Sequence, residues 1–177
     1  METSVGQNIV AICDIDEQRL AAAGERFPNA KRYTDWRKLL EQKDIEAVTI
    51  STPDHTHAAA TYSAISLGKH VYTQKPLTHD VHESRILTQA AEKAGIVSQM
   101  GIQHHSSARL KIAVQVIRDG AIGKVSEVHT WTDRPGTFWK QGLSRPASGD
   151  QVPNHVHWDL WLGTAPERPY VCLLYTS

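Results

Sequence analysis

The stretch IEAVTISTPDHTHAAATYSAISLGKHVYTQKP, residues 45–76, decides the fold. Its first part, 45–52, is apolar and rich in β-branched residues, which is typical of a strand buried on both faces. A helical pattern then begins near Asp54 and ends at Gly68. Its apolar residues Ala58, Tyr62 and Ile65 have helical spacing. A second strand is expected over residues 70–74. Strand, helix and strand in this order predict a βαβ unit with two parallel strands.

The same alternation continues on both sides of this unit. Further strands are expected at residues 9–13, 31–33 and 96–101. Further helices are expected at residues 17–27, 35–42, 80–94 and 106–119. The pattern therefore predicts an α/β fold with a parallel sheet and right-handed crossovers.

A second unit is expected after this alternating part, because the texture of the sequence changes at Gly123. Residues 124–132 alternate only imperfectly between apolar and polar, and residues 134–153 are rich in glycine and proline without a helical period. A long irregular segment often forms a functional loop. We predict a first domain over residues 1–121 and the incomplete start of a second over residues 122–177.

The composition excludes several classes of partner. The 177 residues include 19 Lys and Arg and 19 Asp and Glu, so the net charge is zero with neutral histidines, which argues against nucleic acid and anionic membranes as partners. No apolar run reaches the roughly 18 residues that a membrane-spanning helix needs. The two cysteines, Cys13 and Cys172, lie far apart, which favours a reducing compartment. The cytoplasm is the default location, with export left open because a leader could precede Met1.

Polar residues gather where the predicted strands end. Open parallel sheets bind ligands at the carboxyl ends of their strands, so these residues predict a ligand site on one edge. These residues, with the prolines beside them, are Asp14 after the first strand, Thr52, Pro53 and Asp54 after the third, Gln74, Lys75 and Pro76 after the fourth, and Gln103 after the fifth.

Asp14 stands where dinucleotide-binding folds place an acid that accepts hydrogen bonds from the adenosine ribose. It could instead cap a helix that begins near Ile15, and both interpretations stay open. A carboxylate here favours NAD over NADP because it repels a 2′-phosphate, although the nearby Arg19 moderates this preference. The glycine-rich turn GxGxxG occurs nowhere in the chain, so either there is no dinucleotide site or the turn lies upstream.

Other residues also have structural alternatives. Asp54 could cap the helix that follows it, and Lys75 is either a placed cation or an ordinary solvated lysine. The ten histidines form close pairs on loops, which do not supply the converging ligands that zinc needs, so no metal is predicted. A serine hydrolase is disfavoured because no GxSxG motif is present.

Several motifs, taken in order, resemble the Gfo/Idh/MocA family of glucose-fructose oxidoreductases and inositol dehydrogenases. They are VAICDIDEQRL from residue 10, ISTPDHTH from 50, AISLGKHVYTQKPLTHDVHESR from 64, MGIQHHSS from 100 and VIRDGAIGKVSEVH from 116. The resemblance implies a Rossmann-type doubly wound sheet that binds NAD, or alternatively NADP, followed by the start of an α+β substrate domain. Members of this family oxidise a sugar or polyol hydroxyl or reduce the ketone. The implied partners are a small carbohydrate substrate and, at full length, further copies in a homo-oligomer.

The resemblance also implies roles for individual residues. Asp14 would bind the ribose. The loop and helix start beside the cofactor would be formed by Thr52, Pro53, Asp54 and His57. The family's Glu-Lys-Pro motif near the nicotinamide corresponds to Gln74, Lys75 and Pro76, with Lys75 as the catalytic residue and a glutamine in place of the glutamate. Gln103 would lie toward the substrate.

This sequence departs from the family at both ends. The first strand with its glycine turn and the later acid/base motif are absent, and residues 171–177 match nothing in the family. We expect an internal fragment of a longer protein that is inactive alone. Two other functions stay open: an NAD-dependent glycoside hydrolase of the same family, and a non-catalytic binding fragment.

Overall fold

The computed structural model describes residues 6–131 and 148–171. The chain divides into two compact units, one of residues 1–101 with 152–168 and the other of residues 102–151 with 169–177. Much of the region 122–177 lies outside the described residues, including most of the expected glycine- and proline-rich loop and the last six residues. The domain boundary after residue 121 therefore stays a prediction.

The first unit alternates strands and helices as the sequence predicts. Its strands are β1 (Ala11–Cys13), β2 (Lys31–Tyr33), β3 (Ala47–Ile50), β4 (His70–Gln74) and β5 (Ser98–Gly101). Its helices in this part are α1 (Glu17–Arg26), α2 (Trp36–Leu40), η2 (Asp54–Thr56), α3 (His57–Ser66) and α4 (Val81–Ala94). All strand pairs are parallel, which confirms the α/β prediction.

The strands form two sheets. One holds β1 and β2, and the other holds β3, β4 and β5 in that order. Among the described residues no strand pairing joins β1 to β3, so each keeps one edge without a neighbour.

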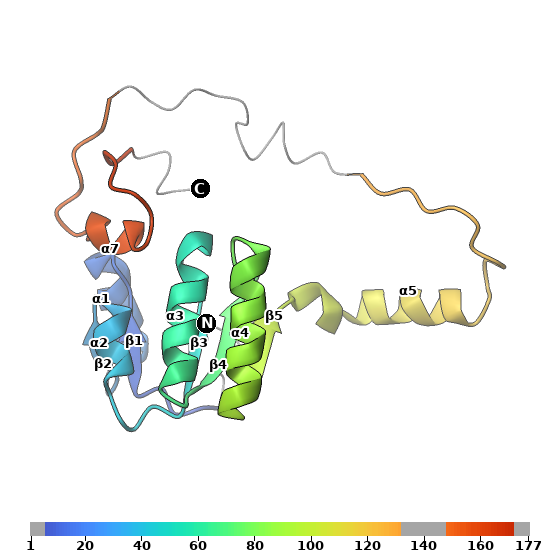
Figure 1. Ribbon diagram of the computed structural model, residues 1–177, viewed down its shortest axis with the longest axis horizontal. Coiled ribbons are helices and arrows are strands. Elements are labelled where there is room, and N and C mark those ends of the chain that lie inside the picture. Colours follow the sequence, from blue (N-terminus) through green and yellow to red (C-terminus); the bar gives the residue numbers. More distant parts are fainter. Residues whose placement is uncertain (1–5, 132–147, 172–177) are drawn as a thin grey trace. The chain divides into compact units, whose positions relative to one another are not determined.

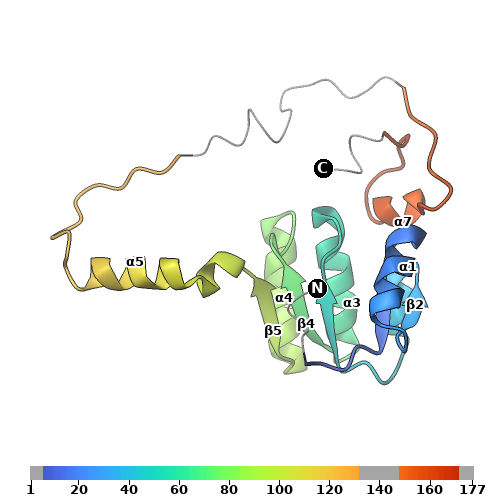
Figure 2. The same cartoon turned by 180° about the vertical axis from the view of Figure 1, so that it is seen from behind.

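The core lies between the three-stranded sheet and the helices α3 and α4, which cover one of its faces (Figures 1 and 2). Its buried members are Leu40, Ala64, Ile65, Val71 and Leu87. Burying a large aliphatic side chain of this kind stabilises the fold by roughly 1.5–3 kcal/mol. The expected stripe of α3 is only partly correct, because Ile65 is buried whereas Tyr62 is 48% exposed.

The helix ends follow from capping residues. Asp16 caps α1 and accepts hydrogen bonds from the backbone N–H groups of Gln18 and Arg19. Asp80 caps α4 through the N–H of Glu83. Gly95 ends α4 in the left-handed conformation, with φ of 66°, which glycine adopts without steric cost.

A late segment returns to the first unit. Residues 152–168, with the short helix α7 (Trp158–Leu162), lie beside the start of α1 (Figure 1). Val156 forms an antiparallel bridge with Asp16, and the N–H of Glu17 donates to the carbonyl of His155 at 2.9 Å. This return segment therefore contacts the residues that directly follow β1.

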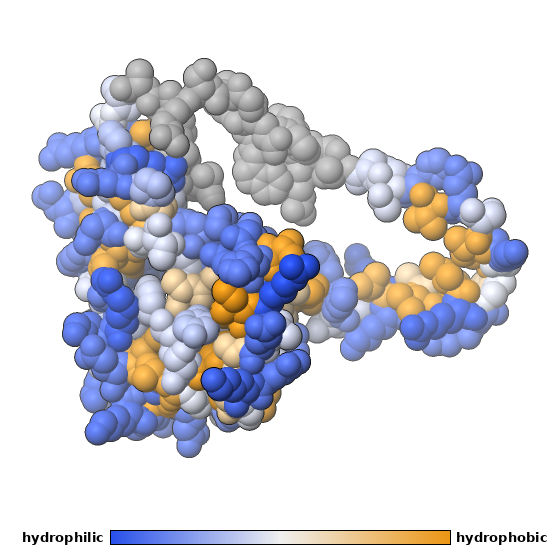
Figure 3. All heavy atoms as spheres, viewed as in Figure 1, coloured by the Kyte–Doolittle hydropathy of each residue, from blue (hydrophilic) through white to orange (hydrophobic). Residues whose placement is uncertain are grey.

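The second unit contains η3 (Gln103–Ser106) and α5 (Ala108–Arg118). The apolar residues of α5 are exposed, and Figure 3 shows apolar surface along this helix. In the described part of the chain, every helix is too short or too polar to cross a lipid bilayer.

Candidate functional site

The carboxyl ends of β3, β4 and β5 share one edge of the sheet. Their parallel registers pair Ile50 with Thr73 and Gln74 with Gly101, so the loops that follow β3 and β4 leave the sheet side by side. This edge carries seven of the predicted site residues: Thr52, Pro53, Asp54, His57, Gln74, Lys75 and Pro76.

Thr52 holds a buried polar atom without a partner. Its side-chain Oγ1 is shielded from solvent and makes no hydrogen bond to any residue that the structure describes. Its backbone carbonyl accepts a hydrogen bond from Nε2 of His57 at 2.7 Å. A buried hydroxyl that lacks a partner costs about 1–3 kcal/mol, and such groups in native proteins commonly await a ligand or water.

Lys75 lies in the neighbouring loop and is exposed. Among the described residues it has no hydrogen-bond or ion-pair partner, and its peptide bond to Pro76 is cis. The side chain of Gln74 lies across Gly101, where a Cβ atom would collide with Oε1 of the glutamine. Because Gly101 has no side chain, it leaves room for the side chain of Gln74, the residue before Lys75.

Asp14 follows β1 at the end of the two-stranded sheet. Its Oδ1 accepts a hydrogen bond from the N–H of Asp16 at 2.9 Å. Burial raises the pKa of Asp14 above its ordinary 3.8, opposed by that N–H and by the charge of Arg19. The alternative that Asp14 caps the first helix is wrong, because Asp16 does so. The Asp14 carboxylate is thus held beside the helix start without being its cap.

Asp54 does not cap a helix either. It is exposed, lies inside the 3-10 turn η2, and neither that turn nor α3 has a side-chain cap. Pro53 precedes the turn, and its carbonyl accepts from the N–H and the hydroxyl of Thr56. The loop after β3 is therefore fixed by Thr56, a residue that sequence reasoning did not select.

Gln103 begins η3 and belongs to the second unit, where its side chain is exposed. Its expected place toward the substrate stays a prediction.

The return segment, residues 152–168, also contacts the residues that follow β1 and β3 in the first unit. Nε2 of His55 lies 2.9 Å from the carbonyl oxygen of Trp161, and the hydroxyl of Thr164 donates to the carbonyl of His55. His157 Nε2 lies 2.9 Å from a carboxylate oxygen of Glu17. These contacts join the residues after β1 and β3 to one segment. No spacing pattern predicts them, because they connect positions more than a hundred residues apart.

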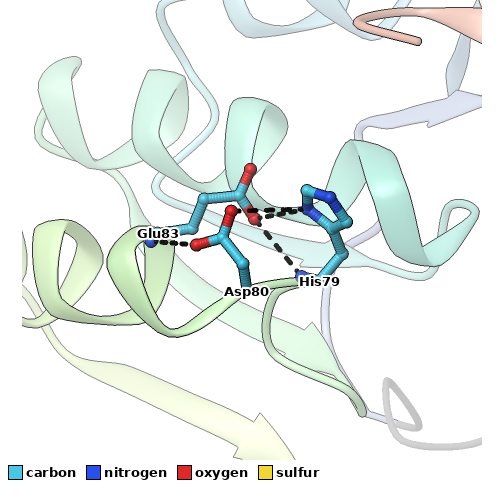
Figure 4. A group of neighbouring side chains, drawn as sticks. All are labelled: His79, Asp80 and Glu83. Atoms are coloured by element: carbon cyan, nitrogen blue, oxygen red, sulfur yellow. Dashed lines mark hydrogen bonds and ion pairs between the residues drawn. The ribbon is translucent and has the colours of Figure 1, made fainter.

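One group of potential metal ligands lies at the start of α4, within the residues that the structure describes: His79, Asp80 and Glu83 (Figure 4). Oδ1 of Asp80 accepts from the N–H of Glu83 at 2.8 Å, and Oε2 of Glu83 accepts from the N–H and Nδ1 of His79. This arrangement resembles a capping box, except that Glu83 accepts from the N–H of His79 and not from that of the N-cap Asp80. The group is therefore explained as a helix cap, and the expectation that the chain binds no metal stays a prediction.

A family model described as an oxidoreductase family with an NAD-binding Rossmann fold matches residues 1–102. The chain belongs to this family, Gfo/Idh/MocA. The resemblance found in the sequence motifs is thereby confirmed, and with it the Rossmann-type fold. The family binds NAD, and its members are oxidoreductases.

The Gfo/Idh/MocA relatives act on carbohydrates. Levoglucosan dehydrogenase of Pseudarthrobacter phenanthrenivorans is 31% identical over 155 residues, which cover 82% of this chain and 40% of that protein. Inositol 2-dehydrogenase of Salmonella typhimurium is 30% identical over 129 residues, covering 72% and 38%. The chain therefore spans about two fifths of the length of these relatives.

A solved structure gives the same fold. The 3-ketoreductase KijD10 from Actinomadura kijaniata, in complex with TDP-benzene and NADP, has a TM-score of 0.63 at 26% identity. The match covers 70% of this chain and 39% of that protein.

The residues of this chain fit a nicotinamide dinucleotide in part. The unpaired hydroxyl of Thr52 and the free cation of Lys75 lie beyond the carboxyl ends of neighbouring strands, and Asp14 directly follows β1. These groups match a ligand with ribose hydroxyls and a polar carboxamide ring. The glycine-rich turn that holds the phosphates in such folds has no counterpart in the sequence.

Proposed function

We propose that this chain supplies the cofactor-binding part of an oxidoreductase that interconverts a carbohydrate hydroxyl and its ketone by hydride transfer. The observation that carries the proposal is the buried, unpaired hydroxyl of Thr52 on the same sheet edge as the free cation of Lys75. The family and the names of the sugar and polyol dehydrogenases that resemble the chain support it.

Each site residue then has a chemical role. Asp14 accepts hydrogen bonds from the ribose hydroxyls, which favours NAD because its carboxylate repels a 2′-phosphate. The hydroxyl of Thr52 forms a hydrogen bond with the cofactor, and Pro53 and Asp54 form the rest of that loop. Gln74 and Pro76 flank Lys75, which donates a hydrogen bond to the reacting oxygen and stabilises the negative charge that develops there. When bound, the nicotinamide supplies the hydride acceptor.

Calorimetric titration of the purified chain with NAD and NADP tests the cofactor site. Asp14→Asn should weaken NAD binding by about 10- to 100-fold, the value of a hydrogen bond to a charged group. Asp44→Asn is the matched control, because Asp44 is exposed and precedes β3 at the opposite edge of the sheet. Equal effects of both variants, or no binding by the folded wild-type chain, would count against the site.

Turnover of the complete gene product tests the role of Lys75. Lys75→Met should lower kcat with a sugar or polyol by about 10²-fold or more, as the loss of one oxyanion donor does, with a smaller effect on NAD affinity. Lys93→Met is the control, because Lys93 is exposed in the last turn of α4. Sugar release without net reduction of NAD would instead indicate a glycoside hydrolase.

A further inference from the structure

His57 is one of the most completely buried large side chains among the described residues, at 1% exposure. Its Nδ1 lies 2.6 Å from the carbonyl oxygen of Pro76, and its Nε2 lies 2.7 Å from the carbonyl oxygen of Thr52. The first carbonyl belongs to the loop after β4, and the second belongs to the loop after β3. The imidazole ring thus connects the two loops, and neither ring nitrogen is left for a ligand.

Each ring nitrogen lies at hydrogen-bonding distance from a carbonyl oxygen, one on each loop. A carbonyl oxygen only accepts, so a hydrogen bond on either side uses a ring N–H as its donor. Because both nitrogens face the backbone of the two loops, the ring has one orientation between them.

We propose that His57 is a positioning residue: its buried imidazole ring clamps the loops after β3 and β4 and thereby fixes Lys75 relative to Thr52. Lys75 directly precedes Pro76, whose carbonyl is one of the two clamped groups. The loop after β3 is tied further by Thr56, which donates to the carbonyl of Pro53. The proposal rests on the proposed function only in that Lys75 is the residue that must be placed.

The first test reads the ring itself and needs neither cofactor nor turnover. The ring nitrogens of the 15N-labelled chain are observed by long-range nitrogen–proton correlation at neutral pH. The clamp predicts that at least one ring N–H of His57 is observed and exchanges slowly with water, because the ring is buried and hydrogen-bonded. Ring N–H exchange at His57 as fast as at the exposed His82 would overturn the proposal even if the chain binds NAD and serves an active oxidoreductase.

The second test asks whether His57 acts through Lys75. In the complete gene product, His57→Phe keeps a planar ring but offers no donor, so kcat should fall by about the same 10²-fold as for Lys75→Met while NAD affinity changes little. The double variant should cost no more than either single variant, because both remove one placed cation. His57→Asn, which can donate to one of the two carbonyls, should retain an intermediate kcat.

The control is His82→Phe, an exposed position on α4 that should leave kcat unchanged. If the fold-losses in kcat of the two single variants multiply in the double variant, His57 does not act through Lys75. If His57→Phe fails to fold, the ring measurement on the wild-type chain decides the proposal. If the complete protein shows no turnover at all, the proposed function fails and the ring measurement still decides the clamp.

Discussion

The unpaired hydroxyl of Thr52 leads to a prediction in which stability and binding change in opposite directions. Thr52→Val keeps the shape of the side chain and removes a buried group that has no hydrogen-bond partner. Such a group costs about 1–3 kcal/mol, so the cofactor-free variant should gain roughly 1 kcal/mol in free energy of unfolding. The same substitution removes one hydrogen bond to NAD, worth about 0.5–1.5 kcal/mol, and should weaken binding about 2- to 10-fold.

The matched control is Thr73→Val on the neighbouring strand. Thr73 is also buried, at 1% exposure, but its hydroxyl lies 2.8 Å from the hydroxyl of Thr61. Removing it leaves Thr61 unpaired and should lower the free energy of unfolding by about 1–3 kcal/mol.

Urea unfolding followed by circular dichroism gives the stabilities, and calorimetry gives the NAD affinities. Destabilisation of Thr52→Val to the extent seen for Thr73→Val would mean that the Thr52 hydroxyl has a partner in the free chain. A gain in stability with unchanged NAD affinity would mean that the cofactor does not use it.

Four further predictions follow from groups described above or buried in the core. Burial raises the pKa of Cys13 to about 12, so in a Cys172→Ser background the folded chain should react slowly with iodoacetamide near pH 8.5, the ordinary thiol value, and quickly after unfolding in urea. The hydrogen bond to Glu83 raises the pKa of His79 above 6.5, so its stabilisation of α4 is present below 6.5 and is lost as the pH rises through the raised value; Glu83→Gln should lower the pKa of His79 in an NMR titration. Because burial raises the pKa of Asp14 above 3.8, stability falls as the pH rises from 3.8 through the raised value, and Asp14→Asn should raise the free energy of unfolding at neutral pH but not in strong acid. Lys69 is buried and its Nζ donates to the carbonyls of Gln42 and Ile45 at 3.0 and 2.9 Å, so Lys69→Met should destabilise the chain by about 1–3 kcal/mol in urea, whereas an equal effect of Lys93→Met would contradict this reading.

The order of strands and helices was accessible from the sequence because it depends on local patterns. Apolar β-branched runs, helical spacing and glycines such as Gly95 define elements whose ends differ from expectation by only a few residues. Local patterns did not predict which of two nearby acidic residues caps α1. Asp14 and Asp16 both precede α1, and only the observed hydrogen bonds show that Asp16 takes the cap.

Other features of the candidate site depend on how distant segments meet. His57 bonds a carbonyl five residues before it and another nineteen residues after it, and the second contact exists only because β3 and β4 are adjacent. The sequence also does not reveal that Thr52 Oγ1 is unpaired, since this depends on which groups of other segments lie within hydrogen-bonding distance of that atom. Spacing rules identify candidate residues, but they do not tell a ligand-binding residue from one that holds its neighbours in place.

The return segment gives the first unit a discontinuous sequence, because residues 102–151 separate its two parts. The hydrogen bonds that join His155 to Glu17 and His157 to Ile15 form within one molecule, so the connecting chain raises the effective concentration of the return segment at the first unit. A single cut by a protease anywhere in residues 102–151 would turn that internal contact into the binding of a separate peptide. At micromolar protein concentration the cut chain would keep its return segment only if these few hydrogen bonds give a dissociation constant below that concentration. Limited proteolysis followed by gel filtration would therefore measure how far the contact depends on the intact chain.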